Sequence, residues 1–116
     1  MQKSSRLRLS KDFKRVYQDG QSVANCNQVV FFLKSGIIGE TRIGFSLSKK
    51  IGSAVVRNRL KRLLREAYRR NEAKIRKGYD LIVIARPPLK EKSLQEVEKS
   101  LLAVFAKAGL LKEEIR

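Results

Sequence analysis

Residues 54–71 carry the pattern that most limits what this chain can fold into. Read as a helix, with about 100° between neighbouring residues, the segment places its apolar side chains on one stripe. Within it, the run RNRLKRLLREAYRR at 57–70 holds seven Arg or Lys and one acid, Glu66. An apolar stripe must be covered by another layer of structure, so the helix has to pack with its charged side outward. The predicted stripe is Val56, Leu60, Leu63, Leu64 and Ala67.

The outward side of this helix is almost purely cationic, whereas an outer face normally mixes both signs of charge. Arg57, Lys61, Arg65 and Arg69 follow one another at i,i+4 spacing, where like charges repel. A polyanion would supply the missing negative charge. The alternative, a solvated face on an ordinary helix, is disfavoured because the acids that would balance the charge are absent.

The composition supports a single domain over residues 1–116 with an anionic partner. The chain has 27 Lys and Arg against 11 Asp and Glu, a net charge of +16, and a hydrophobic fraction of 42% that is sufficient for a core. Such a charge indicates nucleic acid or an anionic membrane surface. No apolar run approaches the roughly 20 residues that span a bilayer, and the N-terminal segment lacks the apolar stretch of a signal peptide.

The sequence offers little for catalysis by the protein itself. It has no histidine, which removes the commonest general base, and with one cysteine, Cys26, it also lacks the usual zinc ligand sets. A single cysteine allows no internal disulfide, so we expect the protein to reside in a reducing cytosol. No pair of acids suggests a two-metal nuclease, and no P-loop or serine elbow occurs. We interpret Cys26 as a small strand residue, and Asp80 as a turn residue or a partner for a basic group. The chain alone is predicted to be a binding protein.

Cap, breaker and alternation signals predict the other elements. They are a helix at 11–19 between a cap at Ser10 and a stop at Gly20, extended chain at 22–33, a hairpin connection at 34–40, a half-buried strand at 41–48, a basic loop at 49–53, a strand at 79–85 and a helix from 94 to 108. Ser93 and Glu96 have the spacing of a capping box before the last helix. The predicted fold class is therefore α+β, a single α/β sandwich domain of order αβββαβα, with a sheet of about four strands and helices packed on it.

Several aromatic side chains could stack on nucleic-acid bases, at roughly 1–3 kcal/mol each. Phe13 and Tyr17 share one face of the first helix, while Phe31 and Phe32 point to opposite faces of their strand. From the pattern alone, Phe13, Tyr17 and Phe31 remain open between base stacking and the core. We assign to the core Phe32, Phe45 and Phe105.

The basic helix and the loop before it have the groups that bind phosphate. Arginine can grip a phosphate with two hydrogen bonds, and Asn58 on the cationic face can both donate and accept. The loop KKIGS at 49–53 precedes the helix, where free backbone N–H groups and the helix dipole also favour phosphate. The pattern therefore predicts contacts with a nucleic-acid backbone.

The run RIGFSLSKKIGSAVVRNRLKRLLRE, at 42–66, closely resembles the signature of the bacterial ribonuclease P protein subunit, with the triplet Arg57-Asn58-Arg59 at its centre. Similarity extends to residues 6–25 and to DLIVIAR at 80–86, so it covers nearly the whole chain. Tyr17 stands where Phe is frequent, Gln28 where an aromatic residue is common, and Ser53 where Asn often occurs. Gln28 is therefore left out of the predicted site.

The resemblance implies a single RNA-binding domain of a cytoplasmic ribonucleoprotein that removes the 5′ leader from precursor tRNA. The partners are a catalytic RNA subunit, in a 1:1 complex, and precursor tRNA. The RNA carries the active site and most of the bound Mg²⁺, and none is bound tightly by this chain. The resemblance also implies a left-handed β–α–β crossover around the basic helix, although about 98% of such crossovers are right-handed.

The family's binding residues transfer to this chain as two overlapping groups. The first would bind the RNA subunit: Lys49, Lys50, Arg57, Asn58, Arg59, Lys61, Arg62, Arg65 and Arg69. The second would bind the single-stranded leader in a cleft between the first helix, the sheet and the basic helix: Phe13, Tyr17, Phe31, Ser46, Ser48, Asn58, Lys61 and Arg65.

Two other functions are alternatives to this interpretation. One is a general RNA-binding or ribosome-associated module of the same fold without a role in cleavage, and the other is a stand-alone nuclease. We also expect anions such as sulfate or phosphate to stabilise the free protein, because a charge of +16 on 116 residues is self-repulsive.

Overall fold

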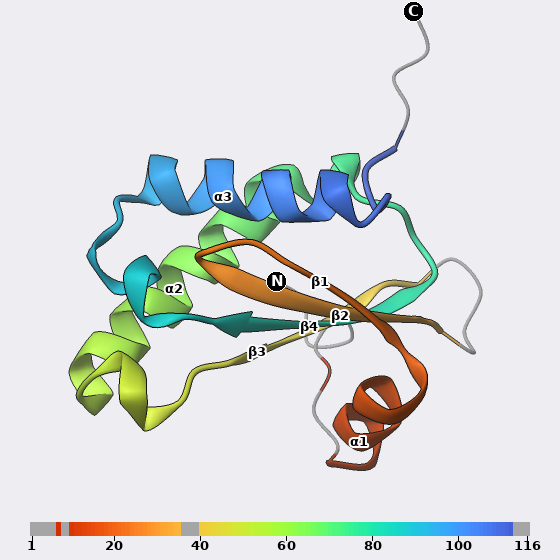
Figure 1. Cartoon of the computed structure of the whole chain (residues 1–116). Helices are drawn as coiled ribbons and strands as arrows, with labels where there is room; N and C mark the ends of the chain where they lie inside the picture. The colour runs from red at the N-terminus through yellow and green to blue at the C-terminus, as the bar shows by residue number, and fades with distance from the viewer. Residues whose placement is uncertain (1–6, 8–9, 36–39, 113–116) are drawn as a thin grey trace, which may run out of the picture.

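The computed structural model of the chain describes residues 7, 10–35 and 40–112, arranged as three helices and one sheet (Figure 1). The order αβββαβα is as predicted. The elements are α1 (Ser10–Asp19), β1 (Gln21–Ala24), β2 (Gln28–Lys34), β3 (Arg42–Ser46), α2 (Ala54–Asn71), β4 (Tyr79–Ala85) and α3 (Leu94–Lys107). Short 3-10 helices lie at η2 (Lys49–Ile51), η3 (Glu72–Lys74) and η4 (Pro87–Glu91).

The four strands form one mixed sheet in the order β1-β2-β4-β3. β1 pairs with β2 and β2 with β4 in the antiparallel sense, whereas β3 runs parallel to β4. The prediction of a hairpin connection at 34–40 is therefore wrong, because β4 lies between β2 and β3. Residues 36–39 of that connection lie outside the described part of the chain.

The parallel pair β3–β4 is joined by α2 in a β–α–β crossover. α2 and α3 cover one face of the sheet and α1 covers part of the other (Figure 1). The crossover around the basic helix is thus present, and its left-handed sense stays a prediction from the family resemblance.

The main core lies between the sheet and the pair α2 and α3. Leu60, Leu64 and Ala67 of the predicted stripe are fully buried there, and Val56 and Leu63 pack at its edge. Among the phenylalanines assigned to the core, Phe32 and Phe105 are buried and Phe45 packs against the same cluster. The stripe and the three assignments are confirmed.

Local signals place the helix ends. Ser53 is the N-cap of α2, and its Oγ accepts a hydrogen bond from the backbone N–H of Val56 at 3.3 Å. Asn, which the family resemblance suggests at this position, would serve equally well as an N-cap residue. The capping box of Ser93 and Glu96 is present at the start of α3, and Gly109, at φ 75°, follows its end.

The interpretation of Cys26 as a strand residue is wrong. Cys26 is exposed in the bend between β1 and β2. The Oδ1 atom of Asn25 accepts hydrogen bonds from the backbone N–H groups of Asn27 and Gln28, each at 3.0 Å, and so turns the chain there. Across the described residues, no helix is long and apolar enough to cross a membrane.

Candidate nucleic-acid interface

The cationic face of α2 is densest in its first half. The single acid of the helix, Glu66, is hydrogen-bonded to Arg69 at 3.0 Å, which lowers the pKa of Glu66, and it also contacts Arg70 at 3.4 Å. Both partners lie toward the C-terminal end of α2. The segment 54–65 contains no acidic residue, so its own sequence supplies positive charge only.

Two arginines of this half are fixed by neighbouring backbone. The Arg57 Nε atom donates to the carbonyl oxygen of Gly52 at 3.2 Å, and an Arg59 terminal nitrogen donates to that of Lys90 at 2.7 Å. A carbonyl oxygen leaves the guanidinium charge in place and leaves other donors for a ligand. Asn58, which lies between these arginines in sequence, is exposed, and so is Arg62, one helical turn after Asn58. The first half of α2 therefore presents ordered cations around an exposed amide.

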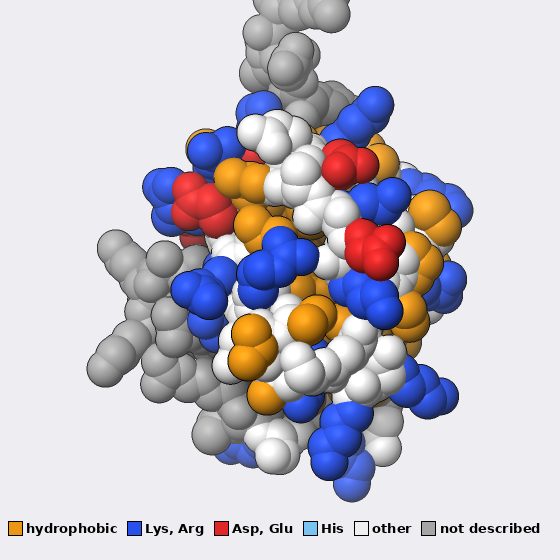
Figure 2. Space-filling model, turned by 90° about the vertical axis from the view of Figure 1, so that its left-hand side faces the viewer, with side chains coloured by type: hydrophobic (Ala, Val, Ile, Leu, Met, Phe, Trp, Pro, Cys, Tyr) orange, Lys and Arg blue, Asp and Glu red, His pale blue; other side chains and the backbone are white. Residues whose placement is uncertain are grey.

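The loop before α2 adds two cations beside the helix N-terminus. Lys49 and Lys50 are exposed in η2, while the buried Ile51 anchors that turn in the core. Gly52 has φ 155°, a conformation that favours glycine, and it leads into the cap at Ser53. Figure 2 views this end of the molecule and shows Lys and Arg side chains over the face, with the acidic side chains gathered in its upper part.

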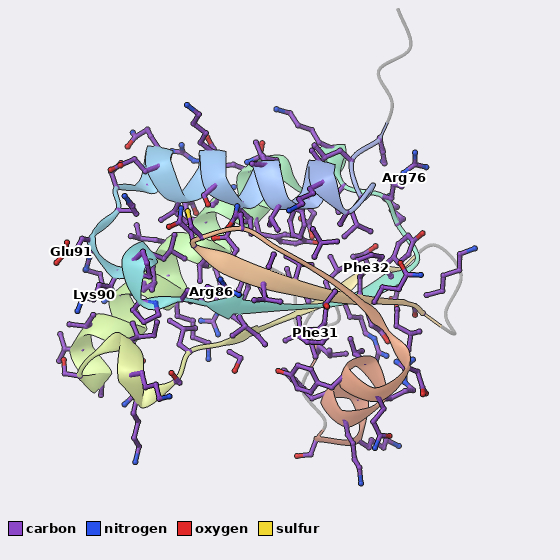
Figure 3. All side chains as sticks on the ribbon, in the orientation of Figure 1. Phe31, Phe32, Arg76, Arg86, Lys90 and Glu91 are labelled. Atoms are coloured by element: carbon purple, nitrogen blue, oxygen red, sulfur yellow. The ribbon has the colours of Figure 1, made fainter. Side chains whose placement is uncertain are left out.

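Three rings of the predicted site lie together on the opposite face of the sheet. The Tyr17 ring of α1 is 6.4 Å from that of Phe13 and 5.0 Å from that of Phe31, the latter in an edge-to-face arrangement. Phe31 points from β2 toward α1, whereas Phe32 points toward α3 (Figure 3). Tyr17 is 38% exposed, and the other two rings are half-buried. The cluster thus offers aromatic surface to a ligand while resting on Val16 and Ile82.

The strand register arranges the sheet face under α1 in rows. Phe31, Ile82 and Gly44 form one row, and Val29, Ile84 and Ser46 form the next. The second row is half-buried. Successive rows are about 7 Å apart along a strand. Because β3 continues from Ser46 toward η2 and α2, it connects the aromatic cluster to the basic helix.

An ionic network lies in the sheet row that precedes Ile82 along β4 and Gly44 along β3. Asp80 of β4 is fully buried, and Arg42 of β3 donates to its two carboxylate oxygens at 2.9 Å each. Arg15 of α1 also donates to Asp80, and Asp12 of α1 lies 3.7 Å from Arg42. The hydrogen bond with Asp80 raises the pKa of Arg42. Asp80 is therefore a partner for basic groups, the second of the two roles expected from the sequence.

The structure places most of the predicted site residues on two surfaces, the sheet face under α1 and the exposed side of α2 with the turn before it. The ring residues form one cluster, and Ser46 lies on the same sheet face. Ser48, Lys49 and Lys50 precede α2, as predicted. Asn58, Lys61 and Arg65, at i, i+3 and i+7, occupy one flank of α2, while Arg59 on the other flank reaches η4.

Sequence reasoning missed four residues that support the rings: Asp12, Arg15, Arg42 and Gly44. The available signal was one acid opening the apolar strand YDLIVIA. The side chain of Gln28, which the predicted site leaves out, is buried toward α3, and its Nε2 atom donates to Ser100 Oγ at 3.0 Å. Within the described residues, no group of three Asp, Glu or Cys side chains could hold a metal ion.

Comparison with known proteins gives one consistent result. The model of the family described as Ribonuclease P matches residues 1–109. The ribonuclease P protein component of Exiguobacterium sibiricum is 44% identical over 116 residues and the two chains cover each other fully. That of Alkaliphilus metalliredigens is 42% identical over 111 residues, which are 96% of this chain and 99% of the other.

Solved structures agree. The RNase P protein of Staphylococcus aureus superposes with a TM-score of 0.86 at 38% identity, covering 95% of this chain and 100% of that one. The RNase P protein of Thermotoga maritima superposes with a TM-score of 0.81 at 38% identity, covering 88% of this chain and 96% of that one.

Proposed function

The chain belongs to the ribonuclease P protein family, and on this premise we propose that it binds a catalytic RNA subunit and the 5′ leader of precursor tRNA. In this complex it promotes endonucleolytic removal of the leader, which gives the mature 5′ end of the tRNA. The single observation that carries the proposal is that β3 runs from Gly44, which lies against the Phe13 ring, through Ser46 to the turn that opens the cationic half of α2. One rigid unit can then hold two RNA segments at a fixed separation.

We assign the RNA subunit to the cationic side. Lys and Arg replace the counterions condensed on an RNA backbone, which gives affinity that falls as salt rises. The ordered guanidinium groups of Arg57 and Arg59 and the exposed Arg62 suit phosphate oxygens. Lys49 and Lys50 extend this surface around the N-terminus of α2, and Arg69 contributes at the far end, where Glu66 offsets part of its charge.

We assign the leader to the aromatic cluster and the adjoining sheet face. A single strand exposes its bases, which can stack on Phe13, Tyr17 and Phe31. Its backbone would then run over Ser46 toward Ser48 and the flank of α2. Asn58, Lys61 and Arg65 on that flank would meet both the leader and the RNA subunit, as the family resemblance implies.

Chemistry is proposed to lie in the RNA, with Mg²⁺ bound mainly by the RNA subunit in a cytoplasmic 1:1 complex. The protein would then contribute substrate binding and charge neutralisation, since repulsion between precursor tRNA and RNA subunit would otherwise oppose their association. Neutralisation should matter most when magnesium is scarce.

A cleavage assay at limiting magnesium tests the proposal. Precursor tRNA is incubated with protein alone, with cognate RNA subunit alone and with both. We expect rapid leader removal only with both. Cleavage by the protein alone would indicate a stand-alone nuclease. Binding without any effect on cleavage would indicate a general RNA-binding module.

A further inference from the structure

The aromatic cluster depends on the placement of α1, because that helix supplies Phe13 and Tyr17 and the sheet supplies Phe31. α1 has ten residues. Isolated helices shorter than about 12–15 residues are marginal in water, so α1 is stabilised by what it contacts. Among the described residues, Val16 is its one fully buried residue and packs with Leu7 and Ile82, and Phe13 is half-buried against the same cluster.

The ionic network supplies the other attachment. α1 carries both an acid and a base of the network at i, i+3 spacing: Asp12 contacts Arg42 of β3, and Arg15 contacts Asp80 of β4. The bidentate pair of Arg42 and Asp80 joins the two strands beneath the helix. Charge-assisted hydrogen bonds are directional, so two attachments on different strands fix both the position and the rotation of α1. The apolar packing of Val16 and Phe13 is non-directional and constrains the rotation of α1 less.

The ionic network has no net charge, unlike the cationic surface proposed to bind RNA. Its two arginines and two aspartates cancel, within a chain of net charge +16. Asp80 is fully buried, and Arg42 and Arg15 have side-chain exposures of 21% and 35%. Buried ion pairs often add little stability over apolar packing but can select one arrangement among several. The network is therefore better explained as fixing the position of α1 than as binding phosphate.

We propose that Asp80 is a positioning residue for leader binding: through Arg15 and Arg42 it seats α1 so that Phe13 and Tyr17 stand beside Phe31. The proposal rests on the proposed leader-binding function of the rings. In this proposal, Asp80 and Arg42 hold α1 over the next row of the sheet. That row consists of Phe31, Ile82 and Gly44.

The test removes the α1 attachment and spares the strands. Arg15→Gln leaves the Arg42–Asp80 pair intact, and Lys11→Gln is a matched control, because it removes the same charge from an exposed site of α1. Hydrogen exchange of α1 amides in the free protein reports the seating of the helix without RNA. We expect about tenfold faster exchange in Arg15→Gln, relative to β4 amides, and no change in Lys11→Gln.

Binding of the assembled complex to leader-bearing and leaderless RNA reports function. We expect Arg15→Gln to lower the leader-bearing affinity about three- to tenfold relative to Lys11→Gln, because apparent affinity scales with the fraction of correctly seated α1. Affinity for the RNA subunit should equal that of Lys11→Gln. Arg15→Lys keeps one donor and should recover most of both effects, and Asp80→Asn should act in the same direction as Arg15→Gln.

The outcomes separate this inference from the function on which it rests. If hydrogen exchange of the α1 amides were unchanged in Arg15→Gln, the role of the ionic network in seating α1 would be overturned, even if Phe13→Ala still impaired leader binding. Faster exchange with unchanged leader affinity would overturn the positioning role. If Phe13→Ala also left leader affinity unchanged, the leader function itself would fail. Should Asp80→Asn unfold, Arg15→Gln and Arg15→Lys still decide the matter.

Discussion

Replacing Gly44 with alanine should displace the Phe13 ring. An ideal Cβ at Gly44 would lie 2.4 Å from Phe13 Cζ and 3.1 and 3.3 Å from its two Cε atoms. Carbon atoms in proteins do not approach so closely, so either the ring or the strand must move. The ring belongs to α1 and is half-buried, whereas Gly44 is held in the ladder with β4, and the ring should therefore yield.

The size of the effect follows from two opposing contributions. Overpacking typically lowers the free energy of unfolding by about 1–3 kcal/mol, while replacing glycine with alanine in a strand raises it by about 0.5–1 kcal/mol. We expect a net loss of about 0.5–2 kcal/mol. Displacement of the ring should also remove up to its stacking energy, about 1–3 kcal/mol, from binding of leader-bearing RNA.

A double-mutant cycle with Phe13→Ala isolates the contact. Without the ring, the new methyl group meets no obstacle from it, so Gly44→Ala should stabilise the Phe13→Ala protein by about 0.5–1 kcal/mol. Denaturant unfolding of the four proteins measures this change of sign. An equal loss from Gly44→Ala in both backgrounds would refute the seating of Phe13 on Gly44.

Four further outcomes are expected. Arg62→Ala should weaken binding of the RNA subunit and lower its salt dependence, measured by filter binding; Arg57→Ala should do the same, with a small loss of stability from its bond to Gly52. Tyr17→Ala should leave the protein folded and reduce affinity for leader-bearing RNA by about 1–3 kcal/mol. Sulfate should raise the melting temperature above that in chloride of equal ionic strength. Burial raises the pKa of Tyr68, so its stabilising effect is complete below the unfolded pKa of about 10 and is lost as pH rises further; Tyr68→Phe should flatten the fall in unfolding free energy from pH 9 to 11.

Local order was predictable where one signal dominated. The predicted helix at 54–71 and strand at 79–85 have the observed bounds, because an apolar stripe or run is delimited there by loop and turn residues. The pairing of strands was not predictable in the same way. β2 and β3 are neighbours in sequence, yet β4 inserts between them, and long-range pairing is set by the crossover through α2 and by burial on both faces of β4.

The candidate site divides along similar lines. Its cationic helix with Asn58 is visible in composition and period alone, whereas Ser46 and the choice of base stacking for the rings needed the family resemblance. The supports of the rings were hidden because Asp12, Arg15 and Arg42 look like ordinary surface charges in sequence. Only the fold brings them to the buried Asp80, 65 residues after Arg15.

The central claim is that one surface binds the RNA subunit and another binds the leader. The most direct measurement is the ratio of affinities for leader-bearing and leaderless RNA, determined for complexes assembled with saturating wild-type, Arg62→Ala or Phe13→Ala protein. We expect Arg62→Ala to need more protein for assembly but to keep the wild-type ratio, and Phe13→Ala to assemble normally with a lower ratio. The same ratio in all three complexes, or a ratio lowered only by Arg62→Ala, would contradict the account.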